Sequence, residues 1–230
     1  MTNKNDKVNF DNFAEEYDQL LRESVGFFSK SDRYFAEYKV AIARELVRED
    51  PHKILEFGCG TGRNVPFLQA KFPGAVIHGT DISKKSLAEA KHLSPDAHFF
   101  IDDEDFYNDP GKYDFVFVAG VFHHVAPDLR DPVLDRIKSK MAPGGSILVF
   151  EHNPYNPITR RIVSNCKYDA DAVLLAMKET STRLTSCGFM VLEKGYCLFF
   201  PERLGAMSKL DRYLRLLPLG GQYFVYARYE

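Results

Sequence analysis

The chain has 230 residues, of which 45% are hydrophobic, and its formal net charge is −2 at pH 7. This length and composition predict one domain, residues 1–230, with a single sizeable hydrophobic core. The near-neutral charge provides no basic field, which argues against nucleic acid as a partner.

The cysteines and the apolar runs indicate the compartment. Four cysteines are widely spaced and form no C-x-x-C pair: Cys59, Cys166, Cys187 and Cys197. This pattern is typical of a reducing compartment rather than of a disulfide framework or a zinc site. The start of the chain lacks the apolar core of a signal peptide, and the run FVFVAGVF is far too short to span a bilayer. We therefore expect a cytoplasmic protein with no stable insertion in a membrane.

Residues 1–50 are predicted to form a helical cap. In NFDNFAEEYDQLLRESVG, Phe13 and Tyr17 lie at helical spacing. A second segment, SDRYFAEYKVAIARELVRED, places Tyr34 and Tyr38 on one face, and Ser31 is a suitable N-cap residue.

Strands and helices alternate from Pro51 to Asn153. The predicted strands are 53–57, 75–79, 97–101, 113–119 and 146–151, and the predicted helices are 63–71, 83–93 and 127–141. Such alternation indicates βαβ units and a parallel sheet that is covered on both faces. We expect an α/β, Rossmann-like, doubly wound and mostly parallel seven-stranded sheet, with residues 51–153 as its cofactor-binding core.

Residues 154–230 are predicted to form a substrate-side segment and the last strands. A helix is expected over about 171–186 and a strand over 189–196, and GQYFVYARY is expected to pair antiparallel at an edge of the sheet. Between these strands, helical spacing predicts an inserted helix whose apolar residues are Leu204, Met207, Leu210, Leu214 and Leu217. This insertion either closes a substrate pocket or docks peripherally on a membrane.

The glycine-rich stretch LEFGCGTG follows the first predicted strand of the sheet and precedes a helix. A phosphate-binding P-loop is excluded, because no Lys-Ser/Thr pair follows. A dinucleotide fingerprint is disfavoured, because its third glycine would fall on Arg63. Glu56 would repel a pyrophosphate but attract an ammonium or sulfonium group.

LEFGCGTG resembles motif I of the class I S-adenosylmethionine-dependent methyltransferases, and the resemblance covers residues 51–153. It implies S-adenosylmethionine as cofactor and S-adenosylhomocysteine as product. The implied cofactor contacts are Tyr17, Glu56, Gly58, Cys59, Gly60, Gly62, Asp81, Ile82, Asp102, Asp103 and Ala119. Asp81 would bind the ribose hydroxyls, or alternatively cap a helix. Asp103 or Asp102 would meet the adenine amino group, and the ring of Tyr17 would fold over the cofactor.

Three histidines are candidates for the chemistry. His123 and His124, in GVFHHVAP, follow the fourth strand of the core, and His152 ends the fifth. Methyl transfer is an in-line displacement, and a hydroxyl nucleophile benefits from a general base such as histidine. Alternatively, the pair orders its loop through hydrogen bonds.

The acceptor is expected to be a small molecule, most simply through a hydroxyl of a sugar, glycolipid or secondary metabolite. Tyr155 would line its pocket, and Arg160 with Arg161 would hold a carboxylate or phosphate, or else begin a solvated helix. The alternatives are C- or N-methylation of a quinone, polyketide or amine, and a non-catalytic scaffold that binds S-adenosylmethionine.

No metal is expected from the sequence. Seven histidines are present, but no H-x-x-x-H pair or carboxylate cluster shows ligand spacing. The oligomeric state has no signal in the sequence.

Overall fold

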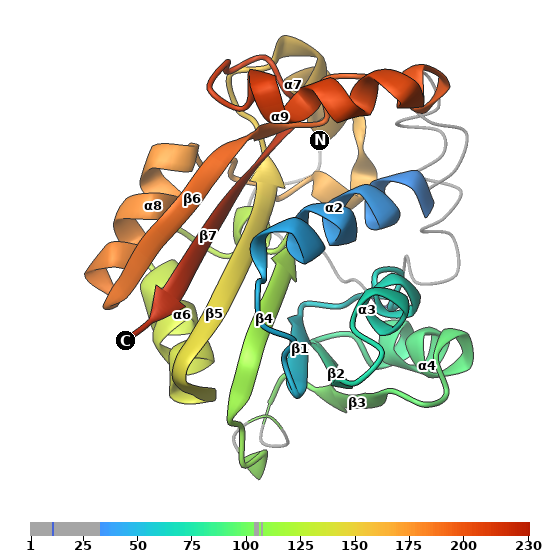
Figure 1. The fold of residues 1–230 in the computed structure, drawn as a ribbon, viewed down its shortest axis with the longest axis vertical. Coiled ribbons are helices and arrows are strands. Elements are labelled where there is room, and N and C mark those ends of the chain that lie inside the picture. The colour runs from blue at the N-terminus through green and yellow to red at the C-terminus, as the bar shows by residue number, and fades with distance from the viewer. Residues whose placement is uncertain (1–10, 12–32, 104–105, 107) are drawn as a thin grey trace.

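Seven strands form one sheet in the order β3-β2-β1-β4-β5-β7-β6. The structure is a computed structural model, and it describes residues 11, 33–103, 106 and 108–230 (Figure 1). The strands are β1 Lys53–Phe57, β2 Val76–Asp81, β3 His98–Ile101, β4 Tyr113–Ala119, β5 Met141–His152, β6 Phe189–Cys197 and β7 Gln222–Tyr229. The first five pair in parallel, and β7 runs antiparallel to β5 and β6. The predicted doubly wound, mostly parallel, seven-stranded sheet is confirmed.

Helices cover both faces of the sheet (Figure 1). The helices α2 (Arg33–Leu46) and α3 (Val65–Lys71) pack on one face, and α6 (Arg130–Ser139) and α8 (Met177–Ser186) pack on the other. The helix α4 (Lys84–Leu93) contacts β2 and β3. Within β1, Ile54 joins the α2–α3 core and Leu55 joins the α6–α8 core, because successive side chains point to opposite faces. This explains why the central strands are apolar almost throughout.

The last strand lies inside the sheet and not at its edge, contrary to the expectation for GQYFVYARY. β7 pairs with β5 on one side and with β6 on the other. Its residues from Tyr223 to Ala227 are all buried, whereas Met190 and Leu192 of β6 are exposed. β6 is therefore the edge strand at this end of the sheet, and Glu193 and Lys194 give it the charge that discourages pairing with another chain.

Two helices begin later than predicted. α6 starts at Arg130 and α8 at Met177, and residues 171–176 cross the sheet edge without helical structure. For α8, long-range hydrogen bonds hold this segment extended: the N–H of Val173 donates to the carbonyl of His123 at 2.7 Å, and Nη2 of Arg130 donates to the carbonyl of Val173 at 2.5 Å. β5 also begins earlier than predicted, because Tyr113 pairs with Met141 before the register shifts.

The C-terminal insertion is not the single helix expected over 204–217. It forms the 3₁₀ segment η4 (Glu202–Leu210) and the short helix α9 (Asp211–Leu214). The apolar stripe that predicted the helix stays exposed at Leu204, Met207 and Leu217, so no core packing stabilises regular helix there. No helix in the described part of the chain is long and apolar enough to cross a membrane.

A polar clamp holds this insertion beside α7 (Pro157–Asn165) at the carboxyl ends of the parallel strands (Figure 1). Nδ2 of Asn153 donates to the carbonyls of Pro218 and Gly220 at 3.1 and 2.8 Å. Nδ2 of Asn156 donates to the carbonyl of Leu219 at 2.7 Å. The predicted helix that contains Phe13 and Tyr17 lies outside the described residues.

Candidate functional site

A cavity of about 330 Å³ opens at the carboxyl ends of the central strands. Its walls come from α2, the glycine-rich loop after β1, the segments after β4 and β5, α7 and the 3₁₀ segment η3 (Lys167–Asp169). The order of the strands reverses between β1 and β4, and such a switch point is where open α/β sheets bind ligands. The volume falls in the range of small-molecule sites.

The glycine-rich loop has a backbone that requires glycine. Gly58, Gly60 and Gly62 have φ values of +69°, +52° and +74°. A Cβ atom on Gly58 would lie 2.4 Å from Cγ2 of Val121, so this glycine also lets the loop pack against the segment after β4. Gly58, Cys59 and Gly60 line the cavity, as does Ala119 at the end of β4.

Asp81 ends β2 beside this loop. Its carboxylate accepts hydrogen bonds from the N–H of Gly60 at 2.8 Å and of Ser83 at 2.9 Å. Ser83 is the residue that caps α4, because its Oγ accepts from the N–H of Ser86 at 3.1 Å. Asp81 therefore braces the glycine-rich loop and is not the helix cap that the sequence left as its alternative role.

Glu56 is a buried carboxylate directly beneath the loop. Its Oε1 accepts from Nδ2 of Asn64 at 2.6 Å, whereas Oε2 has no hydrogen-bond partner in the described part of the structure. Burial raises the pKa of Glu56 to about 8, although Asn64 and the nearby charge of Lys39 oppose the rise. Such an unsatisfied acceptor is costly unless a ligand donates to it, and a cationic donor fits best.

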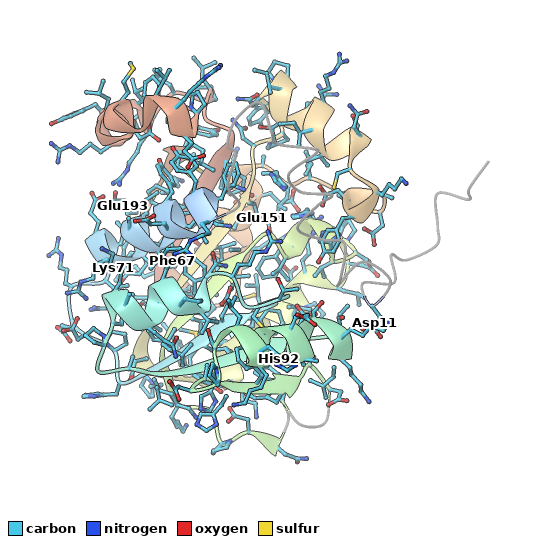
Figure 2. The ribbon with its side chains drawn as sticks, turned by 90° about the vertical axis from the view of Figure 1, so that its right-hand side faces the viewer. Asp11, Phe67, Lys71, His92, Glu151 and Glu193 are labelled. Atoms are coloured by element: carbon cyan, nitrogen blue, oxygen red, sulfur yellow. The ribbon has the colours of Figure 1, made fainter. Side chains whose placement is uncertain are left out.

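His123 is held between two carboxylates. Its Nδ1 lies 2.6 Å from Oε2 of Glu151, and its Nε2 lies 3.5 Å from Oδ1 of Asp169. Burial by itself would lower the pKa of His123, but the negative charges of Glu151 and Asp169 outweigh it and raise the pKa to about 10. Figure 2 labels Glu151 in the interior of the molecule. Because these carboxylates raise its pKa to about 10, His123 already holds a proton on each ring nitrogen at neutral pH and is poorly placed to accept one from a substrate.

His124 has a different environment, although it is the next residue. Its Nδ1 lies 2.9 Å from Oδ1 of Asp171, and the edge of its ring meets Tyr168 with 5.5 Å between the ring centroids. Its Nε2 lies 3.4 Å from Oδ1 of Asp169, the carboxylate that His124 shares with His123. This arrangement of carboxylate and imidazole is suited to a general base.

His152 completes the group of rings. Its ring centroid lies 5.0 Å from that of His123, and it lines the cavity. Burial, assisted by the charge of His123, lowers the pKa of His152 to about 4. Ligand atoms of His123, His152 and Asp169 lie within 4.8 Å of one another. The spacing of histidines in the sequence, which predicts no metal site, does not show this cluster, because its three residues are distant in sequence.

Sequence reasoning missed four polar residues of the site: Lys39, Glu151, Asp169 and Asp171. Lys39 lies in a helix that was predicted for packing only, and Glu151 was identified only as the end of a strand. The stretch KYDAD at 167–171 carries two carboxylates at spacing i, i+2. That spacing was the available signal, but the segment was assigned to the start of a helix.

Several predicted residues lie outside the cavity wall. Tyr155, Arg160 and Arg161 are exposed on the outer side of the α7 segment, whereas Ile158, Thr159 and Ile162 line the cavity. The helical period separates these two sets, so the structure does not bring the arginine pair into the cavity.

The predicted adenosine contacts lie at the ends of β2 and β3 and are not among the residues that line the cavity. Ile82 is exposed, as is Asp103. One oxygen of Asp102 forms an ion pair with Nη2 of Arg136 at 2.7 Å, and its Oδ1 has no hydrogen-bond partner among the described residues. The structure thus leaves both Asp102 and Asp103 as candidates, and Tyr17 lies outside the described residues.

Comparisons with known proteins point to one family. A family model described as a methyltransferase domain matches residues 55–147. Trans-aconitate 2-methyltransferase of Methylobacterium nodulans is 29% identical over 164 residues, 66% of this chain and 60% of that protein. Malonyl-(acyl-carrier protein) O-methyltransferase 1 of Ilyobacter polytropus is 28% identical over 167 residues, 69% of this chain and 60% of that protein. The chain therefore spans about 60% of the length of these curated relatives.

A solved structure agrees in fold. The crystal structure of a SAM-dependent methyltransferase from Archaeoglobus fulgidus superposes with a TM-score of 0.70 at 16% sequence identity. The match covers 92% of this chain and 99% of the other.

Replacing Glu56 by Gln should change how the stability of the ligand-free protein depends on pH. The raised pKa of Glu56, about 8, means that between pH 4.5 and 8 the native state holds a proton that the unfolded chain has lost. Its contribution to the free energy of unfolding therefore falls as pH rises through this window, at up to about 1.4 kcal/mol per pH unit. The charged groups that face Glu56 are Lys39 and Asp81.

Urea unfolding at about pH 5.5 and about pH 7.5 measures this change in the free energy of unfolding. The wild type should lose about 1–3 kcal/mol more than Glu56→Gln between these values. The matched control is Glu89→Gln, since Glu89 is exposed on α4 and should titrate alike in both states. Equal pH dependence in the wild type and Glu56→Gln would contradict the assignment of Glu56 as the buried acid.

Proposed function

Because this chain belongs to the class I S-adenosylmethionine-dependent methyltransferases, we propose that it transfers the methyl group of S-adenosylmethionine to a hydroxyl of a small-molecule acceptor. The observation that carries this proposal is the unpartnered, buried oxygen of Glu56 beneath a loop of left-handed glycines. The ammonium of the cofactor's methionine part is a donor of the right charge for that oxygen. A phosphate ligand would be repelled there.

The rest of the cofactor follows from the order of the strands. The methionine part would lie along Gly58, Cys59 and Gly60, where the loop has no side chains to obstruct it. Asp81, whose carboxylate is held by the N–H groups of Gly60 and Ser83, would accept hydrogen bonds from the ribose hydroxyls. The adenine would then meet the region of Ile82 and of Asp102 or Asp103, with S-adenosylhomocysteine as the product that leaves.

The methyl group would face the end of β4, where His124 and Ala119 line the cavity. Methyl transfer from a sulfonium requires nucleophile, carbon and sulfur to lie in line, and positioning supplies much of the rate. We assign the proton acceptor to His124, because Asp171 orients its ring as described above. His123 acts as a fixed element of the wall, and His152 stands beside it.

The charges around His124 favour a neutral acceptor group. Asp169 and Asp171 both lie beside this histidine, at 3.4 and 2.9 Å from its ring nitrogens. The names of the two relatives concern trans-aconitate and a malonyl group, which are acids. An acceptor carboxylate would be repelled by this pair of aspartates, whereas a hydroxyl can donate to them. An amine acceptor remains the second candidate, because the same aspartates would attract it.

The mouth of the cavity suggests an acceptor with an apolar part. Leu216 is 88% exposed and Tyr213 70% exposed on the C-terminal insertion. Ile158 and Leu219 are also exposed and line the cavity, and we call these four exposed residues the apolar rim. Arg160 and Arg161 of α7 and Arg212 of α9 are exposed as well and add positive charge to these two elements. We propose that the rim contacts an anionic membrane surface that carries a lipid-linked acceptor such as a glycolipid.

Cofactor binding can be measured without knowing the acceptor. At about 100 times its dissociation constant, S-adenosylhomocysteine should stabilise the protein by about 2.7 kcal/mol, which raises Tm by roughly 5–10 °C. NAD and ATP should give no shift. Asp81→Ala should remove most of the shift, whereas Asp128→Ala, at an exposed position, should retain it. A shift with NAD alone would overturn the assignment of the loop.

His124→Gln should lower turnover by about 10²–10⁴-fold, the usual contribution of a general base. The affinity for S-adenosylhomocysteine should change little, because Asp81 and the glycine-rich loop are untouched. Asp171→Asn should act in the same direction by misorienting the ring. The assay would follow transfer of a radioactive methyl group to short-chain alkyl glycosides and to extracted glycolipids, with His92→Gln on the exposed side of α4 as control (Figure 2). Unchanged turnover in His124→Gln would exclude it as the base.

Membrane docking should be visible as co-sedimentation with vesicles. The protein should bind vesicles of phosphatidylcholine with phosphatidylglycerol more strongly than vesicles of phosphatidylcholine alone, and salt should weaken the binding. Leu216→Asp should reduce it several-fold, whereas Leu93→Asp, at an exposed leucine on α4, should not. Equal binding by the two variants would show that the rim is not the docking surface.

A further inference from the structure

Three side chains around the inner end of the cavity have the geometry of a metal-binding face. They are His123 after β4, His152 at the end of β5 and Asp169 at the end of η3. Each offers one ligand atom, and these atoms all lie within 4.8 Å of one another. Atoms bound to one ion at about 2.0–2.2 Å lie no more than about 4.4 Å apart, so small side-chain movements would close the site.

From this arrangement we propose that Nε2 of His123, a ring nitrogen of His152 and the carboxylate of Asp169 bind a divalent transition-metal ion. The inference goes beyond the proposed methyl transfer and does not depend on it, since ion binding can be measured directly.

The outer contacts of His123 support this site. Oε2 of Glu151 lies 2.6 Å from Nδ1 of His123, which fixes the ring and directs Nε2 toward Asp169. Glu151 is itself fixed, because its Oε1 accepts the N–H groups of Val121 and Phe122 at 3.0 and 2.7 Å. A carboxylate behind a ligating histidine is the usual outer arrangement of protein metal sites.

The donor set indicates the class of ion. Two imidazoles and one carboxylate suit first-row divalent ions such as Zn²⁺, Fe²⁺, Mn²⁺ or Co²⁺, and they suit Ca²⁺ and Mg²⁺ poorly. The two buried or largely buried carboxylates, Glu151 and Asp169, match the two positive charges of such an ion.

The open side of this face points into the cavity, because all three ligands line it. Three protein ligands leave coordination positions for water or for an acceptor oxygen, as in catalytic rather than structural metal sites. An acceptor hydroxyl bound there would be acidified beside His124, the assigned proton acceptor. This last role rests on the proposed function, whereas binding of the ion does not.

The competing explanation is a metal-free ion-paired triad in which His123 joins Glu151 and Asp169. The two explanations differ at His152. In the triad His152 only packs against His123, with 5.0 Å between the ring centroids, so its nitrogen is dispensable. In the metal site His152 is a ligand, and its loss removes one of three bonds.

Titration of the chelator-treated full chain with Co²⁺, followed by visible absorption and by calorimetry, tests the site. The wild type should bind one equivalent with a ligand-field band, and His152→Gln and Asp169→Asn should lose that band. Glu151→Gln keeps an acceptor oxygen for the N–H groups of Val121 and Phe122 but removes the charge behind His123, and should weaken binding by about 10–100-fold. His92→Gln is the matched control, because His92 is exposed on α4, and it should bind as the wild type does.

Stoichiometric Co²⁺ binding that persists in His152→Gln, or its absence in the wild type, would overturn the proposal. A thermal shift with S-adenosylhomocysteine shows whether each variant still folds. If the variants do not fold, X-ray absorption of the Zn²⁺-loaded wild type decides: two imidazole ligands support the site, and none overturns it. If the wild type binds no Co²⁺ but is still stabilised by S-adenosylhomocysteine, the proposed metal site is wrong and the proposed cofactor binding is not affected.

Discussion

The buried carboxylate of Glu151 is the contact on which the architecture of the site depends. It ends β5 and accepts hydrogen bonds from two backbone N–H groups, of Val121 and Phe122, and from the ring of His123. These donors all belong to the segment that follows β4, which carries both histidines into the cavity. A buried carboxylate is costly unless several donors satisfy it, and here three do. The same contact lets Val121 pack against Gly58, so the glycine-rich loop is positioned through it as well.

Arg130 holds the same segment from the other side. Its side chain is almost fully buried, and its Nε donates to the carbonyls of Phe122 and Val125, both at 3.1 Å. Nη2 reaches the carbonyl of Val173, and Nη1 pairs with Glu179 at 2.9 Å. A rigid, planar guanidinium can serve four such acceptors at once, which lysine cannot do. Arg130 therefore joins the histidine segment to the chain that carries Asp169 and Asp171.

Two adjacent histidines consequently have different chemistry. His123 lies between Glu151 and Asp169, whereas His124 is oriented by Asp171 and reaches the cavity beside Tyr168. The two rings lie side by side, with 4.1 Å between their centroids, and share Asp169, but the Nδ1 atom of each ring meets a different carboxylate. These different surroundings are the reason why we propose His124 as the proton acceptor and His123 as a fixed residue of the cavity wall.

The sequence by itself determined the sheet and its mostly parallel order, and it predicted the class of cofactor that we propose. Those features depend on local patterns. Apolar runs alternate with helices, and each glycine of LEFGCGTG is the residue type that its own left-handed backbone conformation requires. It also placed Asp81 at the end of its strand and His123 and His124 at the end of theirs. Only the tertiary structure decided the insertion of β7 between β5 and β6 and the partners of the histidines. Glu151 lies 28 residues beyond His123, and Asp171 lies 47 residues beyond His124. Local sequence patterns cannot predict contacts between residues so far apart in the chain, because such contacts form only when the ends of different strands meet at one edge of the sheet.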